Sequence, residues 1–323
     1  MAFNEFLISK RERMSWVAEA TFGAGGTMSS GEIVGYDCAI DAADWNLGFQ
    51  EILTAGADDL NVQSLVTGPK SLPYTMTFTP ANFRWLKYFM AVADADDSGT
   101  KTHTFTQRNT ILSWDLEWAK RHTTNHVITT VGNFAKKATM SFAKASGPGN
   151  EGFLKVAMDC VAQDQSQGSS VTSLSNLTRT PARFNMVKVT IDGTEYKEVN
   201  SGEMAIDLGI TESDSRYCST TNGALIGEPI PGVFRITGRY NINLKDKTLY
   251  DAWAAGTAIS GACTLLVDID GTGNNQLLAT FSNFFIHNAI ASTNEDGKVI
   301  SVDVIWSALS FGSCVSRDNI TSY

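Results

Sequence analysis

The stretch YTMTFTPANFRWLKYF, residues 74–89, begins as an alternating strand and runs directly into an aromatic-rich segment. Apolar residues at every second position over Tyr74–Phe78 predict a strand with one buried face. Pro80 suits the first turn of a helix, and Thr79 before it can serve as the N-cap. We therefore expect a strand that is followed at once by a short helix ending near Val92.

A second stretch, YNINLKDKTLYDAWAA, residues 240–255, has the same plan. Its alternating half predicts another strand, and Asp246 and Gly256 are suited to begin and end a helix. Several strands follow each helix, and each half of the chain closes on a long alternating strand, at 152–162 and at 297–309. The repeated order of elements predicts that one small β-unit occurs twice.

Period-two alternation predicts strands through most of the remaining chain. Turn residues such as Asp192-Gly193 separate the runs. The further expected strands are Thr102–Thr106, Trp114–Trp118, Ala138–Phe142, Leu154–Val161, Val187–Ile191, Met204–Leu208, Phe234–Leu244, Cys263–Ile269, Leu278–Phe285 and Val299–Trp306.

The fold expected from these patterns is mainly β, with two tandem β-sandwich or β-barrel domains that each carry one short flanking α-helix. The first domain would cover residues 1–165 and the second residues 182–323. Residues 166–181 between them are rich in Ser, Thr, Gln and Gly, a composition typical of a linker.

The chain has 323 residues, of which 43% are hydrophobic and 18% charged, and its formal net charge is −9. This composition can support a large folded core. The acidic balance argues against a protein that grips nucleic acid by its phosphates, although it allows nucleic acid to slide past. No apolar run is long enough to span a membrane as a helix, and residues 1–13 lack the apolar core of a signal peptide, so we expect a cytoplasmic product without membrane partners.

No motif gives positive support for catalysis, a cofactor or a metal. The five cysteines form no CxxC pair, and His122 and His126 lie in a turn-like context. Gly23–Thr27 is not followed by the lysine of a phosphate-binding loop. Residues 94–99 and 268–273 place oxygen side chains as calcium loops do, but neither has Glu at the twelfth position. We therefore expect a non-enzymatic protein with buried thiols and solvated turns.

The order of elements over Ser71–Asp164 resembles the tail tube proteins of long-tailed, siphovirus-like bacteriophages and of related archaeal tailed viruses. In the first half the resemblance rests on the strand 72–79, the helix 81–90 and the later strands 102–106, 113–118, 127–132, 136–142 and 152–161. In the second half it rests on 187–193, 234–238 and 299–307.

The resemblance implies subunits that join their sheets side by side into rings, and rings that stack into the hollow tube of a virion tail. Two domains in one chain imply trimeric rings with pseudo-sixfold symmetry. The implied partners are further copies of the chain and the tape measure, tail terminator and distal tail proteins, while DNA would pass without tight binding. Assembly would take place in the host cytoplasm.

Two sets of residues are candidates for contacts in such a tube. The long segment 41–63 carries more apolar residues than a free loop should show, which fits packing on a neighbouring ring or, alternatively, a concealed strand or short helix of the core. Its candidate contact residues are Trp45, Leu47, Phe49, Ile52 and Leu53. Because acids would repel phosphates, the candidates for an acidic lumen or loop are Asp94, Asp96, Asp97, Asp268 and Asp270. The segment 211–232 and the arm 2–13 are further candidates for bridging, the arm equally for a disordered tail.

Other functions stay open on the sequence. A distal tail or tail terminator protein would stop at one ring, whereas a tube subunit would polymerise. A carbohydrate-binding adhesin with two β-sandwich modules would expose aromatic platforms, for which Trp114 and Trp118 are candidates, although a buried sheet face explains these residues more simply. An enzyme is the last alternative, since distant residues can assemble a catalytic triad.

Overall fold

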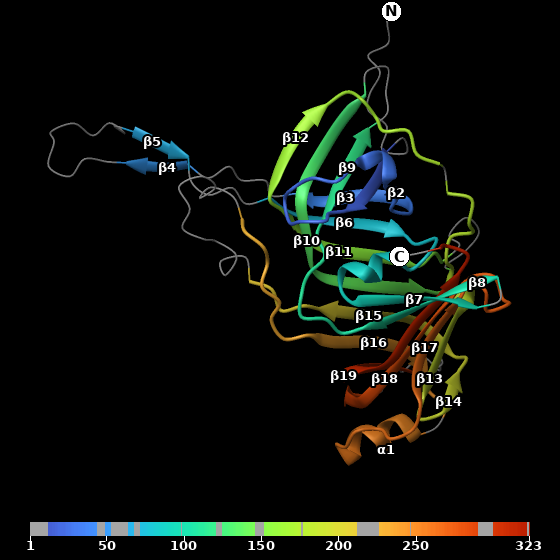
Figure 1. Ribbon diagram of the computed structural model, residues 1–323. Coiled ribbons are helices and arrows are strands. Elements are labelled where there is room, and N and C mark those ends of the chain that lie inside the picture. Colours follow the sequence, from blue (N-terminus) through green and yellow to red (C-terminus); the bar gives the residue numbers. More distant parts are fainter. Residues whose placement is uncertain are drawn as a thin grey trace, which may run out of the picture.

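A computed structural model of the chain is mainly β (Figure 1). Nearly all of its strands join one large antiparallel sheet that curls into a barrel-like body, and two further strands form a small separate sheet. The structure describes residues 12–43, 49–52, 64–67, 72–97, 99–120, 125–145, 152–175, 177–211, 226–245, 247–289, 300–321 and 323.

The strands follow one another along the whole chain. In chain order they are β1 (Glu12–Ala18), β2 (Glu32–Ile33), β3 (Tyr36–Ala43), β4 (Phe49–Ile52), β5 (Ser64–Thr67), β6 (Leu72–Thr79), β7 (Ala91–Asp97), β8 (Thr100–Thr106), β9 (Trp114–Lys120), β10 (His126–Ala143), β11 (Lys155–Ala162), β12 (Asp164–Gly168), β13 (Val187–Ile191), β14 (Thr194–Tyr196), β15 (Val199–Asp207), β16 (Arg235–Asn243), β17 (Cys263–Asp268), β18 (Gln276–Asn288) and β19 (Ser301–Asp318). The helices are the 3-10 helices η2 (Met28–Ser30), η3 (Arg84–Tyr88) and η4 (Phe184–Met186) and the α-helix α1 (Thr248–Ala255).

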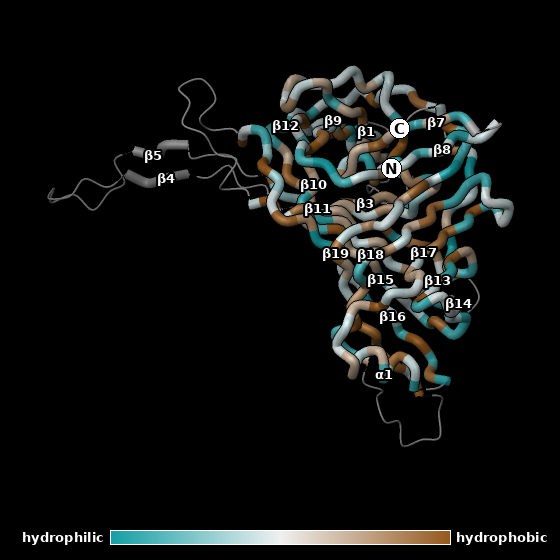
Figure 2. Tube along the Cα trace, turned by 60° about the horizontal axis from the view of Figure 1, so that its bottom comes forward, coloured by the Kyte–Doolittle hydropathy of each residue, from teal (hydrophilic) through white to brown (hydrophobic). Residues whose placement is uncertain are grey.

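Alternation of apolar and polar residues explains why these segments are strands. In β6, Leu72, Tyr74, Met76 and Phe78 are all buried, and the residues between them from Pro73 to Thr77 are half-buried. Successive side chains of a strand point to opposite faces, so one face joins the core and the other stays accessible. Figure 2 shows the same alternation of hydrophobic and hydrophilic residues along many strands. The strands expected from the sequence are confirmed.

The turn expected at Asp192-Gly193 is also confirmed, between β13 and β14. Asp192 has φ 51° and Gly193 has φ 74°. Two consecutive residues with positive φ are typical of the tight hairpin turn that matches the twist of its strands.

The helix expected over 80–92 is wrong in type and length. The chain forms the 3-10 helix η3, with no side-chain cap, and it enters β7 already at Ala91. Trp85, Leu86 and Tyr88 are all buried, and the two charged residues of the segment, Arg84 and Lys87, pair with Glu32. Aromatic residues also lose side-chain freedom in an α-helix, which leaves a short tight turn as the outcome.

The second helix is confirmed as α1. It ends at Gly256, which adopts the left-handed conformation with φ 63°, as expected from the sequence. Its N-cap is Lys247, which makes no side-chain capping bond. The expected cap Asp246 lies outside the described residues.

Strand order repeats between the two halves of the chain. In the first half β3, β6, β11 and the C-terminal part of β10 are consecutive neighbours in the sheet. In the second half β15, β16, β19 and β18 are neighbours in the corresponding order. The hairpin-like pairs β1–β2 and β13–β14 and the pairs β1–β9 and β13–β17 correspond as well.

The two long strands β10 and β18 each bend at a residue with positive φ, and β10 changes partners there. Gly132 has φ 61° and Asn283 has φ 48°, and the pairing register shifts close to both residues. Before the bend β10 pairs with β9 and β12, and after it with β11 and β15. Such bulges let one strand belong to two layers.

Backbone pairing connects the two halves of the chain. β10 pairs with β15, and the C-terminal part of β19 pairs with β8. Part of the expected linker is a strand, because β12 covers 164–168. The division into domains 1–165 and 182–323 stays a prediction.

Candidate assembly surface and polar network

One face of the large sheet is formed by the residues that alternate, along each strand, with the buried residues of the core. We call it the open face and define it by the outward positions of β3, β6, β11, β10, β15, β16 and β19. Across its middle the directly opposed residues are small and uncharged. They are Ala39, Thr77, Ala157, Thr139, Ala205, Thr237 and Ser307.

The open face is hollowed next to this row. The hollow has a volume of about 790 Å³ and is lined by Ser141, Lys155, Ser201, Glu203, Arg239 and Asp303, among others. Arg239 donates to Asp303 at 2.6 Å. The lining also includes Asp37, Phe142 and Phe153, so the hollow presents both polar and apolar surface.

One edge of the sheet is unpaired in the part of the chain that the structure describes. β15 pairs with both β16 and β10, but the corresponding strand β3 pairs with β6 alone among these residues. An open strand edge presents backbone donors and acceptors that another strand can complete.

β4 and β5 form the separate two-stranded sheet and pair from Phe49 opposite Thr67 to Ile52 opposite Ser64 (Figure 1). The alternative of a concealed strand in this segment is therefore confirmed for the strand itself. The strand belongs to the separate two-stranded sheet and not to the large sheet. Trp45, Leu47 and Leu53 lie outside the described residues. The contacts expected for these side chains and for Phe49 and Ile52 stay a prediction.

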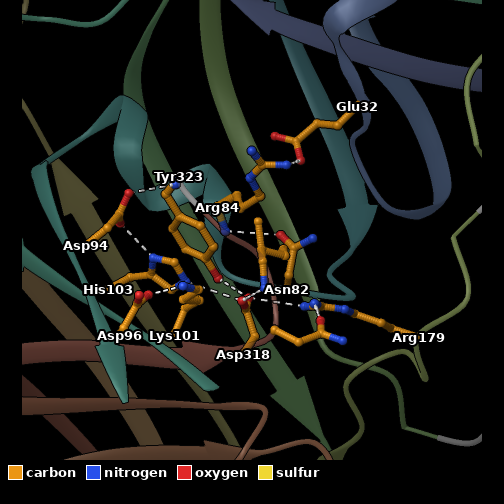
Figure 3. A network of polar contacts seen from close by, with 12 residues as sticks. Glu32, Asn82, Arg84, Asp94, Asp96, Lys101, His103, Arg179, Asp318 and Tyr323 are labelled. Atoms are coloured by element: carbon orange, nitrogen blue, oxygen red, sulfur yellow. Dashed lines mark hydrogen bonds and ion pairs between the residues drawn. The ribbon is translucent and has the colours of Figure 1, made fainter. Parts of the chain in front are cut away.

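A buried polar network ties distant parts of the chain together (Figure 3). His103 on β8 is fully buried. Its Nδ1 lies 2.7 Å from Asp94 Oδ1, and its Nε2 lies 3.2 Å from Asp318 Oδ1. The ring of Tyr323 stacks on His103 at 3.6 Å, and the Tyr323 hydroxyl donates to Asp318 at 2.5 Å. Arg179 also donates to Asp318, at 3.1 Å.

The two carboxylates decide the charge of the imidazole. Burial alone would lower the pKa of His103, but the bonds to Asp318 and Asp94 outweigh it and raise the pKa above 6.5. Burial would raise the pKa of Asp318, but the bonds from His103 and Tyr323 hold it below its usual value. The site therefore places an imidazole with a raised pKa between two carboxylates, and both ring nitrogens are occupied by these contacts. His103 is thus a strand histidine whose two ring nitrogens both have partners.

Two buried acids, Glu19 and Asp115, lie against the glycine-rich loop 23–27. Glu19 accepts from the amides of Gly23 at 3.1 Å and Gly132 at 3.0 Å, and Asp115 accepts from the amide of Gly26. Desolvation and the neighbouring Glu19 raise the pKa of Asp115 to about 7. The amides of Gly23 and Gly26 therefore bind carboxylates of the same chain and are not free to bind a phosphate.

The acids predicted for a lumen or loop lie away from the open face. Asp94 belongs to the network above, and Asp96 pairs with Lys101 across the β7–β8 hairpin. Asp268 and Asp270 accept bonds from the amides of their own turn between β17 and β18. Asp97 ends β7, and its side chain lies outside the description. Whether any of the five faces a lumen stays a prediction.

The two tryptophans considered as a sugar platform do not form one. Trp114 is fully buried and packs 4.4 Å from the ring of Tyr88. Trp118 is half-buried, and its Nε1 donates to Glu12 at 3.0 Å. A buried sheet face, the simpler interpretation, is confirmed for Trp114.

Within the described residues no group of three or more His, Cys, Asp or Glu side chains is placed to hold a metal ion. His126 lies in β10 and not in a helix, while His122 falls outside the described part. None of the described helices has the length and apolarity needed to cross a membrane.

Sequence reasoning missed the partners of His103, because Asp318 is 215 positions away. The pattern of a histidine within a strand was the one available signal.

Comparison with known proteins identifies one family. The family model described as phage tail tube protein matches residues 9–308. No curated protein matches the chain.

Proposed function

Because the chain belongs to the phage tail tube protein family and is thus a structural protein of the phage tail, we propose that it polymerises as stacked rings into the hollow tube that conducts viral DNA into the host. It does so without catalysis. Its partners are copies of itself and the tape measure, tail terminator and distal tail proteins, and assembly takes place in the host cytoplasm.

The pairing of β10 with β15 is the observation on which the proposed ring rests. This pairing joins the first repeat to the second along seven residues, from Lys137 opposite Asp207 to Ala143 opposite Ser201. β3 corresponds to β15 but has no such partner among the described residues. The same kind of junction, formed between chains, would complete the β3 edge and continue the sheet.

Two repeats per chain favour a trimeric ring. If the junction within a chain and the junction between chains are alike, three copies supply six similar units around the axis. This is the pseudo-sixfold ring expected for the two domains 1–165 and 182–323.

The β4–β5 hairpin supports the stacking of rings. An isolated two-stranded hairpin is at best marginally stable in water. Packing against an adjacent ring would supply the missing apolar contacts, with Trp45, Leu47, Phe49, Ile52 and Leu53 as the contact residues.

Electron microscopy of the purified protein tests polymerisation. We expect long hollow tubes in negative stain, and native mass spectrometry of dissociated tubes should give trimers. Single rings would favour a tail terminator or distal tail protein, and a persistent monomer would contradict the proposal.

A pair of proline variants tests the β3 edge. Ala39 and Ile40 are neighbours in a regular part of β3, so their amides point to opposite sides of the strand. One of the variants Ala39→Pro and Ile40→Pro therefore loses a bond to β6 and should unfold at lower temperature. The other should keep its bonds to β6 but lose ring formation. Normal rings from both variants would refute the role of this edge.

A further inference from the structure

The guanidinium of Arg108 has a buried nitrogen without a partner among the described residues. Arg108 follows the end of β8 by two residues, and its Nη2 is shielded from solvent but makes no hydrogen bond there. Burial lowers the pKa of the guanidinium to about 10, and no described acid offsets this effect. Because a guanidinium stays charged at neutral pH, its burial is unfavourable until an anion pairs with it.

Arg108 lines a hollow that is built by close backbone packing. The hollow has a volume of about 280 Å³, and Leu208, Pro231 and Phe234 supply apolar lining. The amide of Gly232 donates to the carbonyl of Leu208 at 2.9 Å. A Cβ at Gly232 would clash with the backbone of the facing segment, so the two segments touch directly. The wall of the hollow is therefore fixed before any ligand enters.

Exposed apolar side chains border this hollow. Ile230 lines it and is 52% exposed, and Val233 close by in the chain is 65% exposed. Apolar patches of this kind mark contact surfaces, and Arg is one of the residues enriched at the centre of such contacts. A small free anion would leave the apolar border in water. A carboxylate carried by a protein surface fits both the charge and the border.

The opposite end of the β7–β8 hairpin is acidic. β7 and β8 have seven residues each, so the turn between them lies about 20 Å from the end that Arg108 follows. Asp96 lies next to this turn, and its side chain is 82% exposed. It pairs with Lys101, but a pair at the surface contributes little to stability and is readily exchanged.

A second acidic turn lies at the same end of the sheet. It joins β17 to β18 and includes Asp268 and Asp270. Arg317 of β19 is directly opposite both Thr102 of β8 and Gln276 of β18, which places the two turns at one end. These strands therefore have acids at one end, and at the other they have a cation without a described partner.

We propose, building on the tube function above, that the hollow at Arg108 is a carboxylate site that receives Asp96 from a second copy of the chain in the adjacent ring. Strands that are joined edge to edge around a ring have their ends toward the neighbouring rings, so the acidic end of one copy faces the Arg108 end of the next. The contact is head-to-tail and repeats without closing, as the stacking of rings requires. Asp96 exchanges its exposed partner for a charge-assisted bond in a more buried place.

The melting temperature of the unassembled subunit separates this contact from a role within one chain. Arg108→Met keeps most of the apolar stem and removes a charge without a partner, so the variant should melt at the same temperature or higher. Arg179→Met is the matched control, because the Arg179 guanidinium pairs with Asp318 of the same chain, and it should melt at a lower temperature. A fall for Arg108→Met as large as that of the control would overturn the proposal.

The critical concentration for polymerisation tests the contact itself, with sedimentation of tubes as the measurement. Arg108→Met and Asp96→Asn should each raise the critical concentration about tenfold or more, the effect of losing one charge-assisted bond at an interface. The double variant should be no worse than either single variant, because both substitutions remove the same contact. In the control, Asp270→Asn from the neighbouring turn should act independently of Arg108→Met.

The possible outcomes are distinguishable. Normal polymerisation of Arg108→Met would overturn the site. Effects of Arg108→Met and Asp96→Asn that multiply in the double variant would overturn the assignment to Asp96. If the unsubstituted protein formed no tubes, the proposed function itself would be contradicted.

Discussion

Replacing His103 by Gln should destabilise the fold in a pH-dependent manner. The substitution removes the imidazole, whose pKa is raised, from between Asp94 and Asp318. The Asp94 side chain is 27% exposed and can recover water, so its bond contributes little to the loss. Asp318 is 1% exposed but keeps its bonds from Tyr323 and Arg179. The net loss is therefore close to that of one charge-assisted bond, about 1.5–3 kcal/mol.

The pH dependence follows from the direction of the shift. The pKa of His103 is raised above 6.5 in the folded protein, so its stabilising effect is complete below 6.5 and is lost as the pH rises through the folded pKa. The pKa of Asp318 is lowered, so its effect is present above 3.8 and is lost as the pH falls through the folded pKa. Between these limits, near pH 6, the difference between His103→Gln and the original protein should be largest.

Thermal unfolding followed by circular dichroism between pH 5 and pH 9 is the suitable assay. At about 2 °C per kcal/mol for a chain of this size, the melting temperature at pH 6 should fall by about 3–6 °C. The difference should shrink toward pH 9. His287→Gln is the matched control, because His287 is exposed and its imidazole bonds only to Ser307 among the described contacts. An equal fall in melting temperature at pH 6 and pH 9, or an equal fall in the control, would refute the pH-dependent stabilisation by His103.

Three further changes test other parts of the structure. Gly132→Ala should cost about 1–3 kcal/mol by urea unfolding, because Gly132 has φ 61° and a Cβ would lie 2.7 Å from Gln163 Cβ, whereas Gly168→Ala, with open space around it, should cost nothing measurable. Asp115→Asn should raise the melting temperature at pH 8 but not at pH 4, because a folded pKa raised to about 7 removes stability as the pH rises from 3.8 to 7; the absence of a pH-dependent gain would contradict the raised pKa of Asp115. Trp114→Ala should cost about 3–5 kcal/mol, and Trp118→Ala clearly less, in chemical unfolding, and the reverse order would revive a surface platform.

The strands were predictable where alternation was strong. β6, β13 and β16 follow directly from their period-two patterns, and the left-handed Gly256 after α1 follows from helix-capping preferences. In these segments local sequence preference and tertiary packing favour the same structure, so a single sequence is sufficient.

Other elements depend on tertiary contacts and escaped prediction. β12 is a polar segment, DQSQG, that becomes a strand because β10 pairs with it. The aromatic residues of η3 resemble a helical stripe, but the segment is fixed by tertiary contacts, with Trp85 and Tyr88 in the core and Arg84 and Lys87 paired with Glu32. β7 was hidden by its acids, which resemble a calcium loop in sequence.

The candidate site was less predictable than the fold. Pairs such as Lys137 with Asp207 become visible only when the strand register is known. The sequence supplied the total charge, and the fold decides on which face each charge lies. For the same reason, the link from His103 to Asp318 could not be read from spacing.

The pairing of β19 with β8 has a consequence for synthesis. β8 ends at Thr106, yet its partner residues, 314–318, leave the ribosome some two hundred residues later. At about 5–20 residues per second, the nascent first half waits ten seconds or more with this edge open. A chain released early would lack residues 314–318 of β19 and, with them, the contacts of Asp318 with His103 and Arg179. Incomplete products would then be unlike finished subunits in shape as well as in length, which would keep them from being built into a growing polymer.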